Sequence, residues 1–171
     1  IKENMTVADV GTGAGFPGLP VKIAVPSLSV TLIDALEKRV NFLNTVIGAL
    51  KLENITAVHK RAEDAGQDGS LRERFDIALS RAVAPLSVLS EYCLPLVKPG
   101  GYFLAMKGPE PETEADGAKE AIKELGGEIE KIKRLTIAEG MTHSVVIIKK
   151  ISQTPQKYPR KAGKPAKSPL K

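Results

Sequence analysis

DVGTGAGFPG, at residues 9–18, directly follows a short apolar run near the start of this 171-residue chain. Glycines in a turn between a strand and a helix permit positive φ angles and let a ligand lie against bare backbone. Gly13, Gly15 and Gly18 match the G-x-G-x-x-G spacing of dinucleotide-binding turns, which on its own is weak evidence. The stretch predicts a strand, a turn and a helix, with a nucleotide-like ligand at the turn.

Three residues inside this stretch narrow the choice of ligand. Pro17 removes a backbone N–H from the turn that would have to cradle a phosphate. Asp9 would lie poorly beside a phosphate but well beside a cation. The ring of Phe16 adds bulk where a phosphate would approach, although it could cover an adenosine. These residues count against a pyrophosphate, so a nicotinamide-dependent oxidoreductase remains only as an alternative.

Short apolar runs alternate with helix-period stretches over residues 1–150. We expect strands at 7–10, 29–34, 55–59, 75–79 and 102–106, helices at 37–50, 86–96 and around 115–125, and two final strands at 129–137 and 144–150. A breaker at 98–101 should end the second of these helices. The pattern predicts a Rossmann-like, doubly wound α/β domain, whose mostly parallel sheet ends in an antiparallel hairpin. Ligands bind such sheets at the carboxyl ends of the strands.

Charge divides the chain into two parts. Residues 149–171 contain eight of the 25 basic residues and none of the 20 acidic ones. We therefore expect one folded domain over residues 1–151, followed by a basic, proline-rich tail over 152–171. The prolines argue against a packed element in that tail. Such arms commonly bind nucleic acid, and a merely solubilising end is the open alternative.

Composition excludes several classes of protein. The single cysteine, Cys93, rules out a disulfide framework and a cysteine metal site, and we expect a cytoplasmic protein without a metal. No apolar run is long enough to span a membrane, and no signal-peptide pattern opens the chain. His59 and His143 are isolated and no Ser/His/Asp order fits a nucleophile elbow, so nothing indicates a covalent catalyst. The chain begins with Ile1 rather than Met, so we expect a fragment.

Polar residues follow two of the expected strands at their carboxyl ends. Asp34 closes the second strand about twenty residues beyond the glycine turn, where a carboxylate takes ribose hydroxyls; capping the next helix is its structural alternative. Lys60, Arg61, Ala62 and Glu63 follow the third strand, where an adenine would lie. Glu63 could read the adenine edge or cap a helix, and spacing alone leaves both open.

Cations also stand at three successive strand ends. Arg81 follows the fourth strand and Lys107 the fifth, on the same edge as Lys60 and Arg61. One such charge would be ordinary, but matched positions suggest a polyanion over the site, most simply the phosphates of a nucleic acid.

Five segments together resemble one known family: DVGTGAGFPGLP, LIDALEKRVNFL, RAED, SRAVAPL and the tail KYPRKAGKPAKSPL. In this order they are similar to the ribosomal RNA small-subunit methyltransferase G family, also called glucose-inhibited division protein B, of the class I S-adenosylmethionine-dependent methyltransferases. The resemblance covers essentially the whole chain. One departure is that the family's N-terminal helical segment is missing.

The resemblance implies methyl transfer from S-adenosylmethionine to N7 of a guanine in bacterial 16S ribosomal RNA. It implies a cofactor site made by the following residues: Gly11, Gly13, Phe16, Asp34, Ala62, Glu63 and Arg81. Arg81 would also position a reacting group. The expected RNA contacts are Lys60, Arg61, Lys107, Lys157, Arg160 and Lys161. A guanine N7 carries no proton, so the reaction needs alignment rather than a general base. A non-catalytic RNA-binding module is the remaining alternative.

Overall fold

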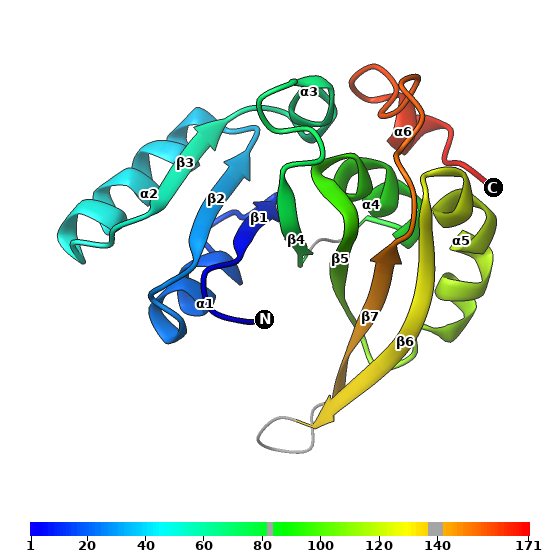
Figure 1. The fold of residues 1–171 in the computed structure, drawn as a ribbon, viewed down its shortest axis with the longest axis horizontal. Coiled ribbons are helices and arrows are strands. Elements are labelled where there is room, and N and C mark those ends of the chain that lie inside the picture. Colours follow the sequence, from blue (N-terminus) through cyan, green and yellow to red (C-terminus); the bar gives the residue numbers. More distant parts are fainter. Residues whose placement is uncertain (82–83, 137–141) are drawn as a thin grey trace.

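The computed structural model describes residues 1–81, 84–136 and 142–171, and within them one twisted seven-stranded sheet forms the centre of the fold (Figure 1). Its strands are β1 (Thr6–Val10), β2 (Ser29–Asp34), β3 (Ile55–His59), β4 (Phe75–Ser80), β5 (Val97–Lys107), β6 (Gly127–Thr136) and β7 (Thr142–Lys150). The order is β3-β2-β1-β4-β5-β7-β6, which Figure 1 shows from left to right. The first five strands pair in parallel, whereas β7 runs antiparallel to both β5 and β6. The predicted fold class is confirmed.

Helices cover both faces of this sheet, because each central strand sends alternate side chains to opposite sides. They are α1 (Gly18–Ala24), α2 (Glu37–Ala49), α3 (Ala62–Gln67), α4 (Leu86–Cys93), the 3₁₀ turn η1 (Leu94–Leu96), α5 (Glu112–Glu124) and α6 (Lys164–Lys167). Val7 of β1 belongs to one buried cluster with Leu19 and Leu43 of α1 and α2. Its neighbour Ala8 belongs to the other cluster, with Leu89 of α4 and Ile122 of α5. None of the helices in the described ranges is long and apolar enough to cross a membrane.

The segment between α4 and the centre of β5 differs from the prediction. The α-helix ends at Cys93, and the 98–101 breaker lies inside β5 instead of separating two elements. The pairing register between β4 and β5 shifts there, because Phe75 pairs with Val97 whereas Ile77 pairs with Tyr102. Gly100 has a φ of +90°, which absorbs the extra residues. The glycines therefore form an irregularity within the strand.

The proline-rich tail is packed, which corrects the expectation of an element-free end. Thr154, Tyr158 and Pro165 are buried, and α6 contacts α4 (Figure 1). Arg72 secures the segment, since its guanidinium donates to the carbonyl oxygens of Tyr158 and Thr154, each at 2.7 Å. Prolines lack an N–H but keep their carbonyls, so a proline-rich chain can be bound through its acceptors alone.

Candidate active site

The glycine turn after β1 lies at the switch in strand order, between β2 and β4. Gly11, Gly13 and Gly15 all have positive φ, as a turn of this kind requires. Gly11 N–H donates to Ile33 O at 2.9 Å, which ties the turn to the end of β2. A Cβ at Gly18 would lie 2.4 Å from the side chain of Leu32. The turn therefore holds its shape through close packing beneath it, while its upper backbone stays bare.

Asp9 is buried under this turn. Its Oδ2 accepts hydrogen bonds from Thr12 Oγ1 at 2.6 Å and from Gly18 N at 2.8 Å. Its Oδ1 is buried and has no partner among the described residues. Burial raises the pKa of Asp9 to about 6, while its hydrogen bonds and Arg81 act in the opposite direction. The site thus contains a buried carboxylate that a cationic ligand would stabilise.

Asp34 has hydrogen-bond partners on both carboxylate oxygens. Its Oδ1 accepts from Leu36 N at 2.9 Å, in the residue just before α2, and no side chain among the described residues caps the helix itself. Its Oδ2 accepts from Gly13 N at 2.9 Å and faces Arg39 at 3.4 Å. These bonds hold the carboxylate beside the glycine turn, and Asp34 also lines the adjoining pocket.

A pocket of about 340 Å³ brings several predicted residues together. Those of the predicted set that line it are Gly11, Asp34, Lys60, Arg61, Ala62 and Glu63. Gly13 borders it through its bond to Asp34. Phe16 lies apart from this lining, and the Arg81 guanidinium stands 5.4 Å from the centre of its ring. The volume is in the range of small-molecule sites, so the edge of the sheet offers room for a nucleoside.

The sequence reasoning missed one wall of this pocket. Gly163 and Ala166 line it and belong to the tail. The Gly163 N–H donates to Glu63 Oε1 at 2.8 Å, so the carboxylate expected to read an adenine is partly engaged by the tail. Nothing local signals such a contact, because the two residues are 100 positions apart in the chain.

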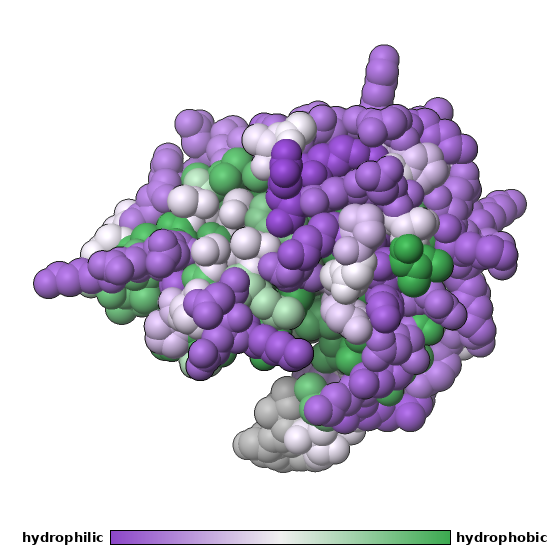
Figure 2. All heavy atoms as spheres, viewed as in Figure 1, coloured by the Kyte–Doolittle hydropathy of each residue, from purple (hydrophilic) through white to green (hydrophobic). Residues whose placement is uncertain are grey.

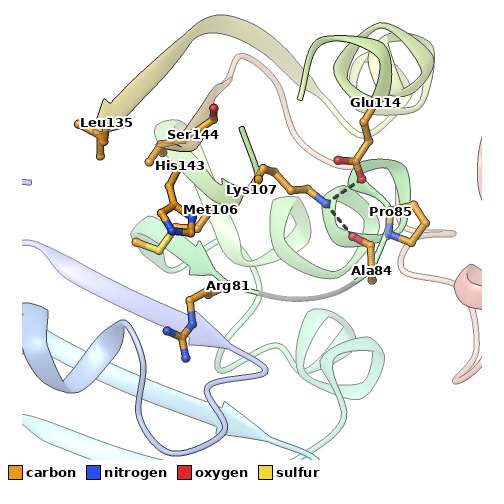
Figure 3. A pocket seen from close by; sticks show the side chains of 11 residues that line it. Arg81, Ala84, Pro85, Met106, Lys107, Glu114, Leu135, His143 and Ser144 are labelled. Atoms are coloured by element: carbon orange, nitrogen blue, oxygen red, sulfur yellow. Dashed lines mark hydrogen bonds and ion pairs between the residues drawn. The ribbon is translucent and has the colours of Figure 1, made fainter. Parts of the chain in front are cut away.

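A second pocket, of about 720 Å³, adjoins the first, because Ala84 lines both. It lies between the ends of β4 and β5 and the beginning of β7, and Figure 3 shows it from close by. Arg81, Lys107, Met106 and His143 are among its lining residues. The Lys107 ammonium is bound inside it, at 2.8 Å from Ala84 O and 2.7 Å from Glu114 Oε1.

The cations expected to contact RNA fall into two groups. Four of them face carboxylates in the structure: Lys60 pairs with Asp68, Lys107 with Glu114, Lys157 with Glu124 and Arg160 with Glu91. Arg61 and Lys161 are exposed and form no ion pair with any described residue. Figure 2 shows hydrophilic side chains over much of the side of the molecule that it presents, with apolar patches between them. Of the six cations expected to contact RNA, Arg61 and Lys161 are therefore the two without an ion-pair partner among the described residues.

The environments of Cys93 and His59 do not indicate a catalytic role. Cys93 is fully buried, and burial, together with Asp9, raises the pKa of its thiol well above the usual value. His59 Nε2 lies 3.1 Å from Ala35 O at the surface. Among the residues that the structure describes, no group of three His, Cys, Asp or Glu side chains could hold a metal ion.

A family model and several related proteins carry one name. The family model for rRNA small subunit methyltransferase G (GidB) matches residues 1–143. The ribosomal RNA small subunit methyltransferase G of Lactobacillus johnsonii is 52% identical over 170 residues, covering 99% of this chain and 71% of that protein. Its counterpart in Alkaliphilus oremlandii is 54% identical over 172 residues, covering 100% and 72%.

Solved structures agree on the fold. A variant of the 16S rRNA (adenine(1408)-N(1))-methyltransferase from Catenulisporales acidiphilia has a TM-score of 0.73 at 17% identity, covering 92% of this chain and 88% of that one. M. jannaschii TYW2 in complex with AdoMet has a TM-score of 0.69 at 18% identity, covering 88% and 71%. The fold is that of the class I S-adenosylmethionine-dependent methyltransferases, and the chain belongs to the ribosomal RNA small subunit methyltransferase G family.

Proposed function

We propose that this chain transfers a methyl group from S-adenosylmethionine to N7 of a guanine in 16S ribosomal RNA, in the cytoplasm. Family membership makes it an rRNA methyltransferase that uses S-adenosylmethionine. We assign this function to particular residues because two pockets meet at Ala84. One pocket contains the residues suited to a nucleoside cofactor, and the other is open for a base.

The residues of the smaller pocket suit the cofactor. A Cβ at Gly11 would meet nothing within 4 Å, so bare backbone faces open space there. Asp34 is already held by two backbone N–H groups and can accept further bonds from ribose hydroxyls. Ala62 and Glu63 would lie at the adenine side. Asp9, whose Oδ1 has no described partner, supplies negative charge near the turn for a cationic ligand. When bound, S-adenosylmethionine supplies an electrophilic methyl group on a sulfonium.

Arg81 is the candidate positioning residue. It follows β4, is exposed, lines the larger pocket and lies over the ring of Phe16. A guanidinium has five donors in a planar fork, which suits a carboxylate or the edge of a base. Arg81 would hold one such group in the larger pocket, so that the methyl acceptor is aligned.

The residues at the site suit guanine N7 as the methyl acceptor. N7 has a free lone pair and no proton, so no general base has to act first. The cysteine that C5 transfer would use as a nucleophile is absent from the described pocket linings, and Cys93 is buried as a thiol. The sequence at the end of β4 is Ser80-Arg81-Ala82, without the Asn/Asp-Pro-Pro sequence that suits exocyclic amines. Catalysis then rests on orientation of the two reactants.

For RNA docking we propose Arg61 and Lys161 as phosphate contacts, because both are exposed and unpaired among the described residues. Lys60, Lys107, Lys157 and Arg160 would contact phosphates only if their carboxylate partners released them. We further propose that residues 1–151 form the methyltransferase domain. Residues 152–171 would pack against this domain and add positive charge to its surface.

Calorimetric titration with S-adenosylmethionine and with NAD, followed by transfer of labelled methyl to a 16S rRNA transcript, tests this function. We expect binding of S-adenosylmethionine alone, and label on one guanine that disappears when this guanine is replaced by 7-deazaguanine. Binding of NAD alone would establish an oxidoreductase instead. RNA binding without any label transfer would indicate a non-catalytic module.

A further inference from the structure

The larger pocket contains an ion pair between β5 and α5 that the reaction described above does not use. Lys107 and Glu114 approach to 2.7 Å, and the Lys107 side chain is only 9% exposed. Figure 3 shows the two side chains pointing toward one another on one side of the pocket, with Arg81 at the other end. The Lys107 ammonium is costly to desolvate at this depth, which suggests a use beyond stability, whereas the Glu114 side chain is 34% exposed and accessible from the pocket.

Both members of the pair keep unused hydrogen-bonding capacity. An ammonium has three donors, and Lys107 uses two of them, for Ala84 O and Glu114 Oε1. Glu114 makes its contacts to Lys107 and to Leu86 N through Oε1, whereas Oε2 has no partner among the described residues. The pocket therefore presents one free donor beside one free anionic acceptor.

Of the two purines in RNA, this arrangement is complementary to guanine. The Watson–Crick edge of guanine presents the O6 acceptor next to the N1–H and N2–H donors. Adenine presents a donor in place of O6 and an acceptor at N1. Its donor would then face the Lys107 ammonium, and its acceptor would face the Glu114 carboxylate. We propose that Lys107 and Glu114 are the guanine-reading pair of this enzyme. Lys107 donates to O6, and Glu114 Oε2 accepts from N1–H and N2–H.

The proposal rests on the proposed function and explains how N7 remains reactive. N7 is the nucleophile, so no donor can occupy its lone pair, and the base has to be read from its other edge. Because N7 lies on the far side of O6 from N1, a guanine bound to Glu114 turns N7 away from that carboxylate. Pro85, Met106 and Leu135 supply apolar surface in the same pocket for the faces of an extruded base.

Replacing the target guanosine of a 16S rRNA transcript by inosine tests the pair without changing the protein, because inosine lacks only the N2 amine. We expect kcat/KM for methyl transfer to fall about 10-fold with inosine. Equal values for the two RNAs would overturn the proposal. Absence of transfer to the guanosine RNA would instead count against the proposed function itself.

Glu114→Gln tests the same contact from the protein side. Gln retains an acceptor for Leu86 N but loses the charge, so we expect kcat/KM with guanosine RNA to fall about 10- to 100-fold. The penalty for inosine should shrink at the same time, because the contact that inosine removes is already weakened. Glu112→Gln is the matched control, since Glu112 begins the same helix but pairs with Arg134 on the surface.

A purely structural role for Glu114 predicts a different result. Glu114→Gln would then lower the rates on guanosine and inosine RNA by the same factor, and the inosine penalty would stay as large as in the unmodified protein. That outcome would overturn the proposal. Unchanged rates in Glu114→Gln on both RNAs would do so as well.

Discussion

The backbone N–H of Gly163 donates a 2.8 Å hydrogen bond to Oε1 of Glu63, which joins the C-terminal tail to the first turn of α3. Gly163 and Ala166 then form one wall of the pocket whose other residues include Gly11 and Asp34. The tail is consequently part of the proposed cofactor site as well as a source of positive charge. Its attachment to the domain should therefore affect both stability and ligand binding.

The ion pair between Arg160 and Glu91 is the strongest attachment point of this tail. Glu91 is fully buried, and Arg160 binds it in a bidentate manner, with Nε–Oε1 and Nη2–Oε2 distances of 2.9 and 2.6 Å. Arg160→Ala leaves a buried carboxylate without its partner, so we expect the free energy of unfolding in urea to fall by about 3 kcal/mol. S-adenosylmethionine should also bind more weakly in calorimetry.

The neighbouring exposed cation is the control for this change. Lys161→Ala should alter the unfolding free energy by less than about 0.5 kcal/mol, because Lys161 has no ion-pair partner among the described residues. A decrease below about 1 kcal/mol for Arg160→Ala would show that the pair does not hold the tail.

The strands β2 and β3 were predictable because each is a short run in which apolar and β-branched residues predominate. Ser29–Asp34 and Ile55–His59 match the prediction at both ends. A helix was expected after the glycine turn, but the bounds of the short helices α1 and α3 were not predicted, since six or seven residues give too few turns for a 3.6-residue period to show. The breaker inside β5 was misread because glycines and a proline look alike in a loop and in an irregular strand.

The site was predictable where its residues follow strands and not where a distant segment contributes. Gly11, Asp34, Ala62 and Glu63 line one pocket because the topology places the ends of parallel strands together. Arg160 was expected to bind RNA, but its partner Glu91 is 69 positions away in the chain. Charge at one position does not reveal a buried opposite charge so far away in sequence.

The glycines of the turn differ in the space beside them, which predicts different costs for alanine. A Cβ at Gly15 would lie 2.2 Å from Leu19 Cδ1 and 3.0 Å from Leu43 Cδ2, whereas a Cβ at Gly13 would meet nothing within 4 Å. Both residues have positive φ, so each substitution costs about 1–2 kcal/mol of backbone strain. Gly15→Ala should cost about 1 kcal/mol more from overpacking. Urea unfolding of the two variants measures the difference, and equal destabilisation would contradict it.

Asp9 predicts a pH dependence of stability. Its pKa is raised from 3.8 to about 6 in the folded protein, so between these values the folded state binds more protons than the unfolded state. Stability from this group therefore falls as pH rises through the window, by about 3 kcal/mol in total. Asp9→Asn does not titrate, so the unfolding free energy of the variant relative to the unmodified protein should increase from pH 4 to pH 6.

Differences between the two proteins isolate Asp9 from the other carboxylates, which titrate in both. A difference for Asp9→Asn that does not vary between pH 4 and pH 6 would contradict the raised pKa of Asp9.

Positive charge on the tail predicts a salt-dependent affinity for RNA. Lys161, Lys164 and Lys167 are exposed around α6, close to the pocket wall formed by Gly163. Replacing all three by Gln should reduce the magnitude of the log Kd against log salt slope by about 0.7 for each phosphate that the variant no longer neutralises. Lys51→Gln, beyond the far end of α2, should leave the slope unchanged. An unchanged slope for the triple variant would leave the tail with a purely structural role.

Arg81 lines the larger pocket, and its replacement should separate catalysis from folding. It is exposed and its cation–π contact with Phe16 spans 5.4 Å, so Arg81→Ala should change the unfolding free energy by no more than about 0.5 kcal/mol. Impaired alignment, in contrast, should lower kcat/KM for methyl transfer about 100-fold. Arg81→Lys keeps the charge without the planar fork, so a rate close to that of Arg81→Ala would indicate that geometry is the essential property. Turnover near that of the unmodified protein in Arg81→Ala would remove Arg81 from the site.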